Sequence, residues 1–565
     1  MNHNHQISNK KDKSSIDVFD FMIALLFFGS LLMRLVAASK LPLNAYESAL
    51  LIGNPGKATV WENPISLIES ILIKPTYFMF GQSQFGARVW PAMAGSMLML
   101  IPLYIKEVLG KKMSMVLALL LMIEPFLLGN SLQVGGHVFA ILGLSLIISA
   151  WLRNNIALTI IGGSILFLSG RGLFPALLII AMLYFLNRKF QPFFSPKSGN
   201  NNTGNRKVDP RLGFTVAVVF TILFISYLKI DLSALFSSLS AFIPQTTKIY
   251  FRQAEIPGLP VVFLSYAPLS FALFIIFCYR FRNKEKTLVL ILLILVAILS
   301  LWAAITPAKN YSDLVWVTLP MLIGSAYYLS NLSVPDCKSS WMIMLLISII
   351  LTISLLVSFS QFIYHGRYRI SQGNSVINMI TILFLFIFVY FTYLTFGSGR
   401  RFLRATGMSI LIIGFVFQAT STFRAGGISS DVSQELLWSG AIADADIVTR
   451  TVDMRSNSNR YVGEEMQIGL EKGLSPQLMW ILKDENISSF PAGISGPLPL
   501  DIVITKENSI QLFGKYVGQS LTVDAYPKWI ETPLNSLFDY DYWSWLIFRN
   551  SNLEKVTHHI WYAME

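Results

Sequence analysis

One carboxylate stands where a base would be useful at a membrane face. Glu47 follows the first long apolar run by a few residues, in the segment Leu43-Asn-Ala-Tyr-Glu-Ser-Ala-Leu50. A carboxylate in this position can act as general base on an acceptor hydroxyl or amine. Taken alone, such a residue is more often the solvated acid of an ordinary loop.

Cations at the ends of other apolar runs would suit a departing phosphate. They are Arg34, Arg88, Arg171 in Ser169-Gly-Arg-Gly172, and Lys309 in Thr306-Pro-Ala-Lys-Asn-Tyr311. Arginine makes bidentate phosphate contacts and lysine supplies a point charge. The alternative for each cation is that it snorkels to lipid headgroups. The two glycines beside Arg171 favour binding, because the backbone there can approach a ligand closely.

Two more ionisable residues are candidates for substrate binding. Glu124 lies near the end of the third apolar run, where an ionisable group is a functional candidate. Its neighbour Pro125 frees backbone groups, so a packing role is the alternative. His137 stands at an expected helix start, where a structural role is the alternative.

The composition places most of the chain in lipid. Of its 565 residues 53% are hydrophobic and 13% are charged, against about 25% charged in soluble proteins. The net charge of +12 is interpreted as membrane topology rather than nucleic-acid binding. Cys278 and Cys337 are far apart and show no metal-site spacing, so neither a disulfide nor zinc is implied.

The apolar runs predict an all-α polytopic bundle with about 13 transmembrane helices. The expected spans are 18–38, 86–105, 113–130, 135–152, 156–169, 171–187, 212–229, 261–280, 287–305, 312–330, 341–362, 376–396 and 405–420. Lys and Arg gather in every second loop, which places the N-terminus in the cytoplasm and the C-terminal part outside a cell (plasma) membrane. The first run has no cleavage site and is expected to be retained.

Three parts of the chain follow from this topology: a cytoplasmic tail over 1–17, a transmembrane domain over 18–420, and an extracytoplasmic domain over 421–565. The first outer loop covers 39–85. Alternating segments such as Asp501–Thr505 and Ser520–Asp524 predict strands between helices, hence a small α/β domain. The aromatic segment 534–549 could stack on sugar rings or anchor at the membrane boundary.

The start of the first outer loop resembles a known family. Members of the dolichyl-phosphate-mannose protein mannosyltransferase and aminoarabinose transferase superfamily (glycosyltransferase family 39-like, GT-C fold) end their first span with arginine, then proline, then an acidic pair. This chain has Arg34, Pro42 and Tyr46-Glu47 in that order, with one acid of the pair missing.

Further motifs carry the resemblance over about the first 150 residues, and topology carries it afterwards. Phe85-Gly-Ala-Arg-Val-Trp-Pro-Ala-Met-Ala-Gly95 is similar to the family's entry to the second span, and Glu124–Ser131 resembles its Pro-x-x-x-x-x-Ser-Arg segment. Trp61–Ile65 matches a His-Pro-Pro-Leu turn loosely. Lys309–Pro320, which contains Tyr311, loosely resembles a Lys-x-x-x-Tyr-x-x-x-x-Pro entry to a late span.

One departure bears on metal dependence. Where many relatives place an arginine and a second acid in the next outer loop, this chain reads Ser131-Leu-Gln-Val-Gly-Gly-His137. That acid often helps to hold a metal or to position the lipid phosphate, so its absence argues against a divalent cation. No cofactor is implied, and His137 is the candidate substitute.

The resemblance implies a membrane glycosyltransferase that moves a sugar from a polyprenyl-phosphate donor to a protein, lipid or glycan acceptor on the outer face. Glu47 would be the base, and Arg171, Lys309 and Arg88 would stabilise the departing phosphate. The alternative is a catalytically degenerate GT-C-like protein that binds glycan or scaffolds an envelope complex. A transporter is disfavoured, because neither repeated halves nor paired charges at mid-membrane are found.

Overall fold

The structure is a computed structural model of the chain. It describes residues 18–44, 47–48, 51, 66–153, 155–189, 258–305, 311–332, 339–396, 398–427, 434–438, 444–462, 466–472, 474, 476–491, 500–506, 516–531 and 533–563. The expected span at 212–229 lies outside these residues, as do Lys309 and the Trp61–Ile65 turn.

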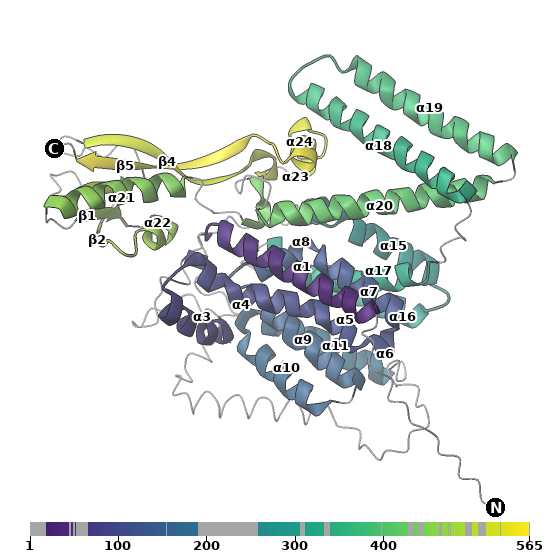
Figure 1. The fold of residues 1–565 in the computed structure, drawn as a ribbon, viewed down its shortest axis with the longest axis horizontal. Coiled ribbons are helices and arrows are strands. Elements are labelled where there is room, and N and C mark those ends of the chain that lie inside the picture. Colours follow the sequence, from purple (N-terminus) through teal and green to yellow (C-terminus); the bar gives the residue numbers. More distant parts are fainter. Residues whose placement is uncertain are drawn as a thin grey trace, which may run out of the picture.

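A bundle of apolar helices forms the larger part of the molecule (Figure 1). Its first half comprises α1 Val18–Lys40, α3 Leu67–Phe80, α4 Gln84–Met97, η1 Leu98–Leu100, α5 Ile101–Tyr104, α6 Lys106–Leu109, α7 Lys111–Met122, α8 Pro125–Ser131, α9 Val138–Arg153, α10 Ile156–Leu168, η2 Gly170–Gly172 and α11 Leu173–Lys189. Its second half comprises α14 Gly258–Tyr266, α15 Pro268–Phe281, α16 Lys286–Ile305, η3 Tyr311–Leu314, α17 Val315–Ser330, α18 Ser339–Arg367, α19 Gly373–Thr395 and α20 Gly399–Ala425.

The helices identify a multi-pass membrane protein. In the described ranges, 5 helices are long and apolar enough to cross a bilayer, or up to 7 if each bent pair is one span. The bends, 63° between α7 and α8 and 93° between α14 and α15, fall where Pro125 and Pro268 begin a new helix. The total of about 13 spans stays a prediction.

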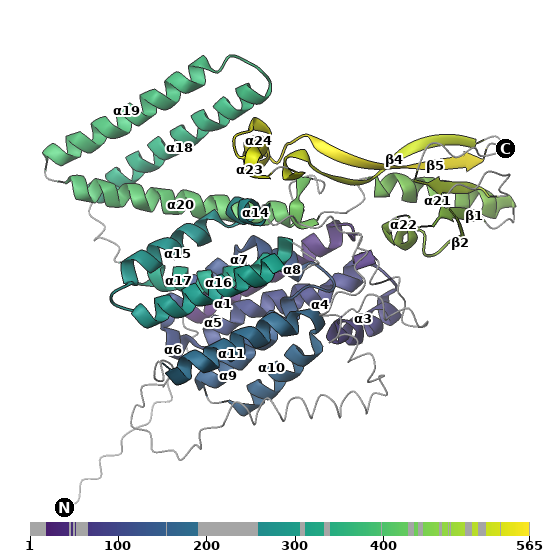
Figure 2. The same ribbon diagram turned by 180° about the vertical axis from the view of Figure 1, so that it is seen from behind.

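A hairpin of α18 and α19 projects from the bundle, and α20 runs from its base towards the C-terminal domain (Figures 1 and 2). Only 6% of the most apolar part of α19 is buried. A helix that is apolar on all sides is stable in this position when lipid surrounds it. The hairpin therefore agrees with a membrane setting.

The expected C-terminal α/β domain is confirmed. Its sheet has the strand order β2-β1-β3-β5-β4, in which β1 pairs in parallel with β2 and β3 while β5 pairs antiparallel with β3 and β4. The elements are η5 Leu436–Trp438, α21 Ala445–Val462, β1 Gln467–Glu471, α22 Pro476–Ile481, β2 Asn486–Phe490, β3 Ile502–Thr505, β4 Tyr516–Pro527, η6 Lys528–Glu531, α23 Pro533–Ser536, α24 Tyr540–Phe548 and β5 Leu553–Ala563.

The aromatic segment attaches this domain to the bundle. Trp545 of α24 is fully buried and its indole N–H donates to the Gln434 carbonyl at 2.6 Å. Arg549 lies over the Trp545 ring and donates to Glu435 at 2.9 Å, and Glu435 accepts from Tyr266 of α14 at 2.6 Å. Most of the aromatic area in this part of α24 is therefore packed inside the protein.

The other end of the domain contacts the first loop. Gln477 donates to the Leu43 carbonyl at 3.4 Å, and Lys483 donates to the Gln82 carbonyl at 2.8 Å. Trp480 packs beside Tyr77 of α3, with ring centroids 6.4 Å apart. The domain thus covers the end of the bundle where α1 ends and α4 begins.

Candidate functional site

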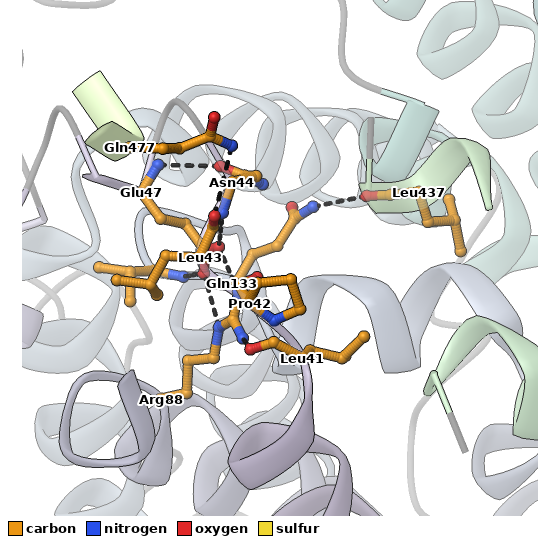
Figure 3. Close-up of polar contacts among 10 residues, drawn as sticks. Leu41, Pro42, Leu43, Asn44, Glu47, Arg88, Gln133, Leu437 and Gln477 are labelled. Atoms are coloured by element: carbon orange, nitrogen blue, oxygen red, sulfur yellow. Dashed lines mark hydrogen bonds and ion pairs between the residues drawn. The ribbon is translucent and has the colours of Figure 1, made fainter. Parts of the chain in front are cut away.

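Glu47 and Arg88 form a fully buried ion pair between the first loop and α4 (Figure 3). The Arg88 Nε donates to Glu47 Oε1 at 2.9 Å, and its Nη2 donates to Glu47 Oε2. Both side chains come from segments that the sequence marks as candidates, 41 residues apart. This two-point contact is the strong geometry for an arginine and a carboxylate.

The same pair anchors the loop backbone. Arg88 also donates to the carbonyls of Leu41 and Pro42, the latter at 2.9 Å. Glu47 accepts from the N–H of Asn44 on Oε2 and from the N–H of Val134 on Oε1, each at 3.0 Å. A carboxylate offers about four acceptor positions, so each oxygen of Glu47 already holds two hydrogen bonds.

A second acid, Glu69, lies in the same site. It is fully buried on α3, and its Oε2 accepts from the N–H of Gly135 at 2.8 Å. The consecutive N–H groups of Val134 and Gly135 are therefore held by two acids of the first loop. Gly135 has φ +77°, which suits glycine and turns the two N–H groups towards these carboxylates.

Sequence reasoning missed Glu69, although a signal was present. Ser66 and Glu69 have the spacing of a capping box, and Ser66 Oγ accepts from the Glu69 N–H at 3.4 Å. In the structure the Glu69 side chain reaches the 132–136 loop instead. Burial raises the pKa of Glu69 to about 8; the contacts with Ser66 and Gly135 act in the opposite direction, and the charge of Glu47 adds to the rise. Its Oε1 is buried and accepts no hydrogen bond from any described group.

His137 lies at the start of α9 and pairs with an acid that the sequence did not single out. Its Nε2 is 2.8 Å from Oδ1 of Asp313, a residue of η3 that is 176 positions away, and both side chains are buried. The rings of Trp302 and Trp316 meet the imidazole edge-on. The loop at 131–137 contains no carboxylate of its own, and three acids reach it from elsewhere.

The cations expected to bind phosphate are only partly within the described residues. Arg171 lies in η2, whose glycines pack closely: a Cβ on Gly170 would lie 3.3 Å from Ser66 Cα, and one on Gly172 would lie 3.1 Å from His137 Nδ1. The Arg171 backbone thus runs between the start of α3 and His137. Its side chain, like Lys309, is outside the described part.

Arg34 lies inside the helices instead of at a surface. It is fully buried on α1, and its Nε donates to Ser131 Oγ at 2.8 Å. Gly95 of α4 permits this crossing, because a Cβ there would lie 2.3 Å from Ser131 Cβ. Tyr311 is also buried, with its hydroxyl near the backbone of Gly258.

Glu124 belongs to a different cluster, at the break between α7 and α8. Its Oε2 accepts from Ser270 of α15 and from Gln418 of α20, each at 3.2 Å. The side chain is fully buried. These contacts join the start of α8 to α15 and α20. Among the described residues, Glu124 therefore shares no hydrogen-bond partner with Glu47 or Glu69.

Comparison with known proteins defines the fold. ArnT from Cupriavidus metallidurans, solved bound to undecaprenyl phosphate, matches 95% of this chain and 97% of its own with TM-score 0.50 and 13% identity. The chain therefore has a GT-C-like fold. The apo structure of that protein matches 84% of this chain and 86% of its own, with TM-score 0.48 and 14% identity. No family model matches the sequence, and no curated protein does.

The two acids differ in their contacts. Glu47 is paired with Arg88 and holds the first loop, whereas one oxygen of Glu69 accepts no hydrogen bond from a described group. A buried carboxyl with a raised pKa is a strong base once it has lost its proton. The GT-C-like bundle thus presents an acid pair at the end covered by the C-terminal domain.

Proposed function

We propose that the protein is a membrane glycosyltransferase that moves a sugar from a polyprenyl-phosphate donor to an acceptor on the outer face of the cell membrane. The observation that carries the proposal is the pair of buried first-loop acids, Glu47 and Glu69, gathered on adjacent N–H groups of the 132–136 loop. The GT-C-like fold supports it, because the solved neighbour binds undecaprenyl phosphate.

The proposed reaction is inverting transfer. The acceptor oxygen or nitrogen attacks the anomeric carbon, and the bond to the phosphate oxygen breaks with its electron pair staying on the polyprenyl phosphate. The acceptor proton passes to a carboxylate. The role of Glu47 as this base stays a prediction; we favour Glu69 Oε1, because both Glu47 oxygens are already saturated by donors.

The departing phosphate needs positive charge. We propose Arg171 and Lys309 for this role, with Arg88 positioning Glu47 and the loop. His137, paired with Asp313, and Tyr311 would line the substrate-binding region beside them. Arg34 and Glu124 would shape it from within the bundle.

The test uses the full-length protein in lipid vesicles with a radiolabelled polyprenyl-phosphate sugar and a native acceptor extract. Glu69→Gln and Glu47→Gln keep side-chain volume, and Glu107→Gln changes an exposed acid elsewhere as the matched control. We expect at least about a hundredfold loss of transfer for Glu69→Gln, the usual weight of a general base, and no loss for the control. If Glu69→Gln and Glu47→Gln both transfer sugar at the parent's rate, the proposal is wrong.

A second candidate function is a catalytically degenerate GT-C-like protein that binds glycan or scaffolds an envelope complex. The saturated state of the Glu47 carboxylate favours it, because a structural acid needs no access to substrate. Binding of the polyprenyl-phosphate sugar without turnover, measured on the same vesicles, would select this candidate.

A further inference from the structure

A cavity of about 510 Å³ lies where the end of α18 meets η6, α23 and α24. Its lining includes three cations, Arg367, Arg369 and Lys528, and two acids, Asp539 and Asp541. Ligand sites of small molecules have volumes of about 300–1,000 Å³. The cavity is built from other elements than the first-loop site.

The three cations differ in their contacts with the rest of the protein. Arg367 has a structural role, because it donates to Ser544 Oγ at 2.6 Å and to the Asn550 carbonyl. Its Nη2 also lies 3.8 Å from Asp541 Oδ1. Within the described part of the chain, neither Arg369 nor Lys528 lies within 4 Å of a carboxylate oxygen, although the charge of Lys528 acts on Asp541 at longer range. Neither cation is held in a close ion pair, so both can turn to an anion in the cavity.

The backbone at Arg369 gives an independent reason to assign it a function. Helix α18 ends in a Schellman motif, with the Ile370 N–H on the His365 carbonyl at 2.8 Å and the Arg369 N–H on the Gly366 carbonyl at 3.3 Å. Arg369 occupies the left-handed position, φ +56°, where glycine is normal. Arg549 has a similar φ and is held by Glu435, whereas Arg369 has no such partner among the described acids. Strained backbone positions of this kind gather at functional sites, so Arg369 is a candidate for a role in the cavity.

A candidate membrane span also ends at the cavity. Helix α18 supplies a span of 28 residues, Ser340–Arg367, that ends at the cavity. Phe538, beside Asp539, is 93% exposed, and Tyr368 and Ile370 are about half exposed. Exposed aromatic and apolar side chains at the end of a span are typical of the membrane interface.

We propose that this cavity binds the phosphate of a phospholipid headgroup that also carries an amine or a hydroxyl, at a place separate from sugar transfer. Arg369 and Lys528 hold the phosphate. The carboxylates of Asp539 and Asp541 accept hydrogen bonds from the amine or hydroxyl, which a choline headgroup cannot donate. The proposal does not depend on the proposed transferase activity.

The experiment measures the thermal midpoint of delipidated full-length protein in detergent during titration with phosphatidylethanolamine, phosphatidylglycerol, phosphatidylcholine or inorganic phosphate. We expect the first two lipids to raise the midpoint at much lower concentration than the last two. Arg369→Gly relieves the left-handed strain, so it should raise the midpoint without lipid and yet require on the order of tenfold more lipid for half the shift.

Lys528→Ala provides a second variant that leaves the helix end intact and should weaken the lipid effect similarly. Arg450→Gln removes a matched exposed charge from α21, at the far end of the domain from α24 (Figure 1), and should change nothing. The proposal is overturned if both cavity variants respond to lipid as the parent does. An equal effect of inorganic phosphate would instead identify a soluble anion, and an equal effect of phosphatidylcholine would remove the role of the two acids.

Discussion

The pH dependence of transfer is the sharpest consequence of burying Glu69. Its pKa of about 8 means that the base form is scarce at neutral pH. If Glu69 takes the acceptor proton, kcat/KM should rise about tenfold for each pH unit at pH values well below 8. The deprotonated fraction grows from about 1% at pH 6 to about half at pH 8, so the expected increase is about fiftyfold.

The same group has a calculable effect on stability. A carboxyl whose pKa is raised by folding binds its proton more tightly in the folded state, so the protein loses stability as pH rises between the ordinary value of 4.5 and 8. At about 1.4 kcal/mol per pH unit, reduced near pH 8 because the group is then half deprotonated, the loss from pH 6 to pH 8 is roughly 2 kcal/mol. Glu69→Gln should abolish this share of the pH dependence.

The assay combines transfer rates in vesicles with unfolding in detergent from pH 6 to pH 9, for the parent, Glu69→Gln and Glu69→Asp. The aspartate variant keeps a titrating group and should keep a sloping profile, shifted in pH. A flat rate profile in the parent, together with identical unfolding profiles in the parent and Glu69→Gln, would show that Glu69 is neither buried nor basic as described.

Two further predictions concern the packing around the site. Arg88→Ala leaves the buried Glu47 carboxylate without its counter-charge and should cost about 3–5 kcal/mol of stability. In chemical unfolding, the double variant Arg88→Ala with Glu47→Gln should recover part of this loss. If the losses of the two single variants simply add, the two side chains do not form a direct pair. Gly95→Ala places a methyl group 2.3 Å from Ser131 Cβ and should cost about 1–3 kcal/mol. Gly407→Ala, with nothing within 4 Å, should be neutral or stabilising by about 1 kcal/mol, and equal thermal shifts for the two variants would refute this packing.

The membrane class and the α/β nature of the C-terminal domain follow from the sequence alone. Long apolar runs need lipid or a partner helix whatever their neighbours are, and alternation over Asp501–Thr505 is a local signal that β3 fulfils at Ile502–Thr505. Glu47 and Arg88 could likewise be picked out, because each stands beside the end of an apolar run. Their pairing with each other could not be predicted, since 41 residues separate them.

Only the tertiary structure decided which groups meet. Glu69 had the local signature of a helix cap, yet packing turned its side chain to Gly135, 66 residues away. Asp313 lies within the expected span 312–330, and nothing in the sequence connects it with His137, which folding brings next to it. Sequence periodicity records which face of a segment is apolar, whereas proton affinity depends on burial and on the charges and donors that surround a group, and these come from distant segments.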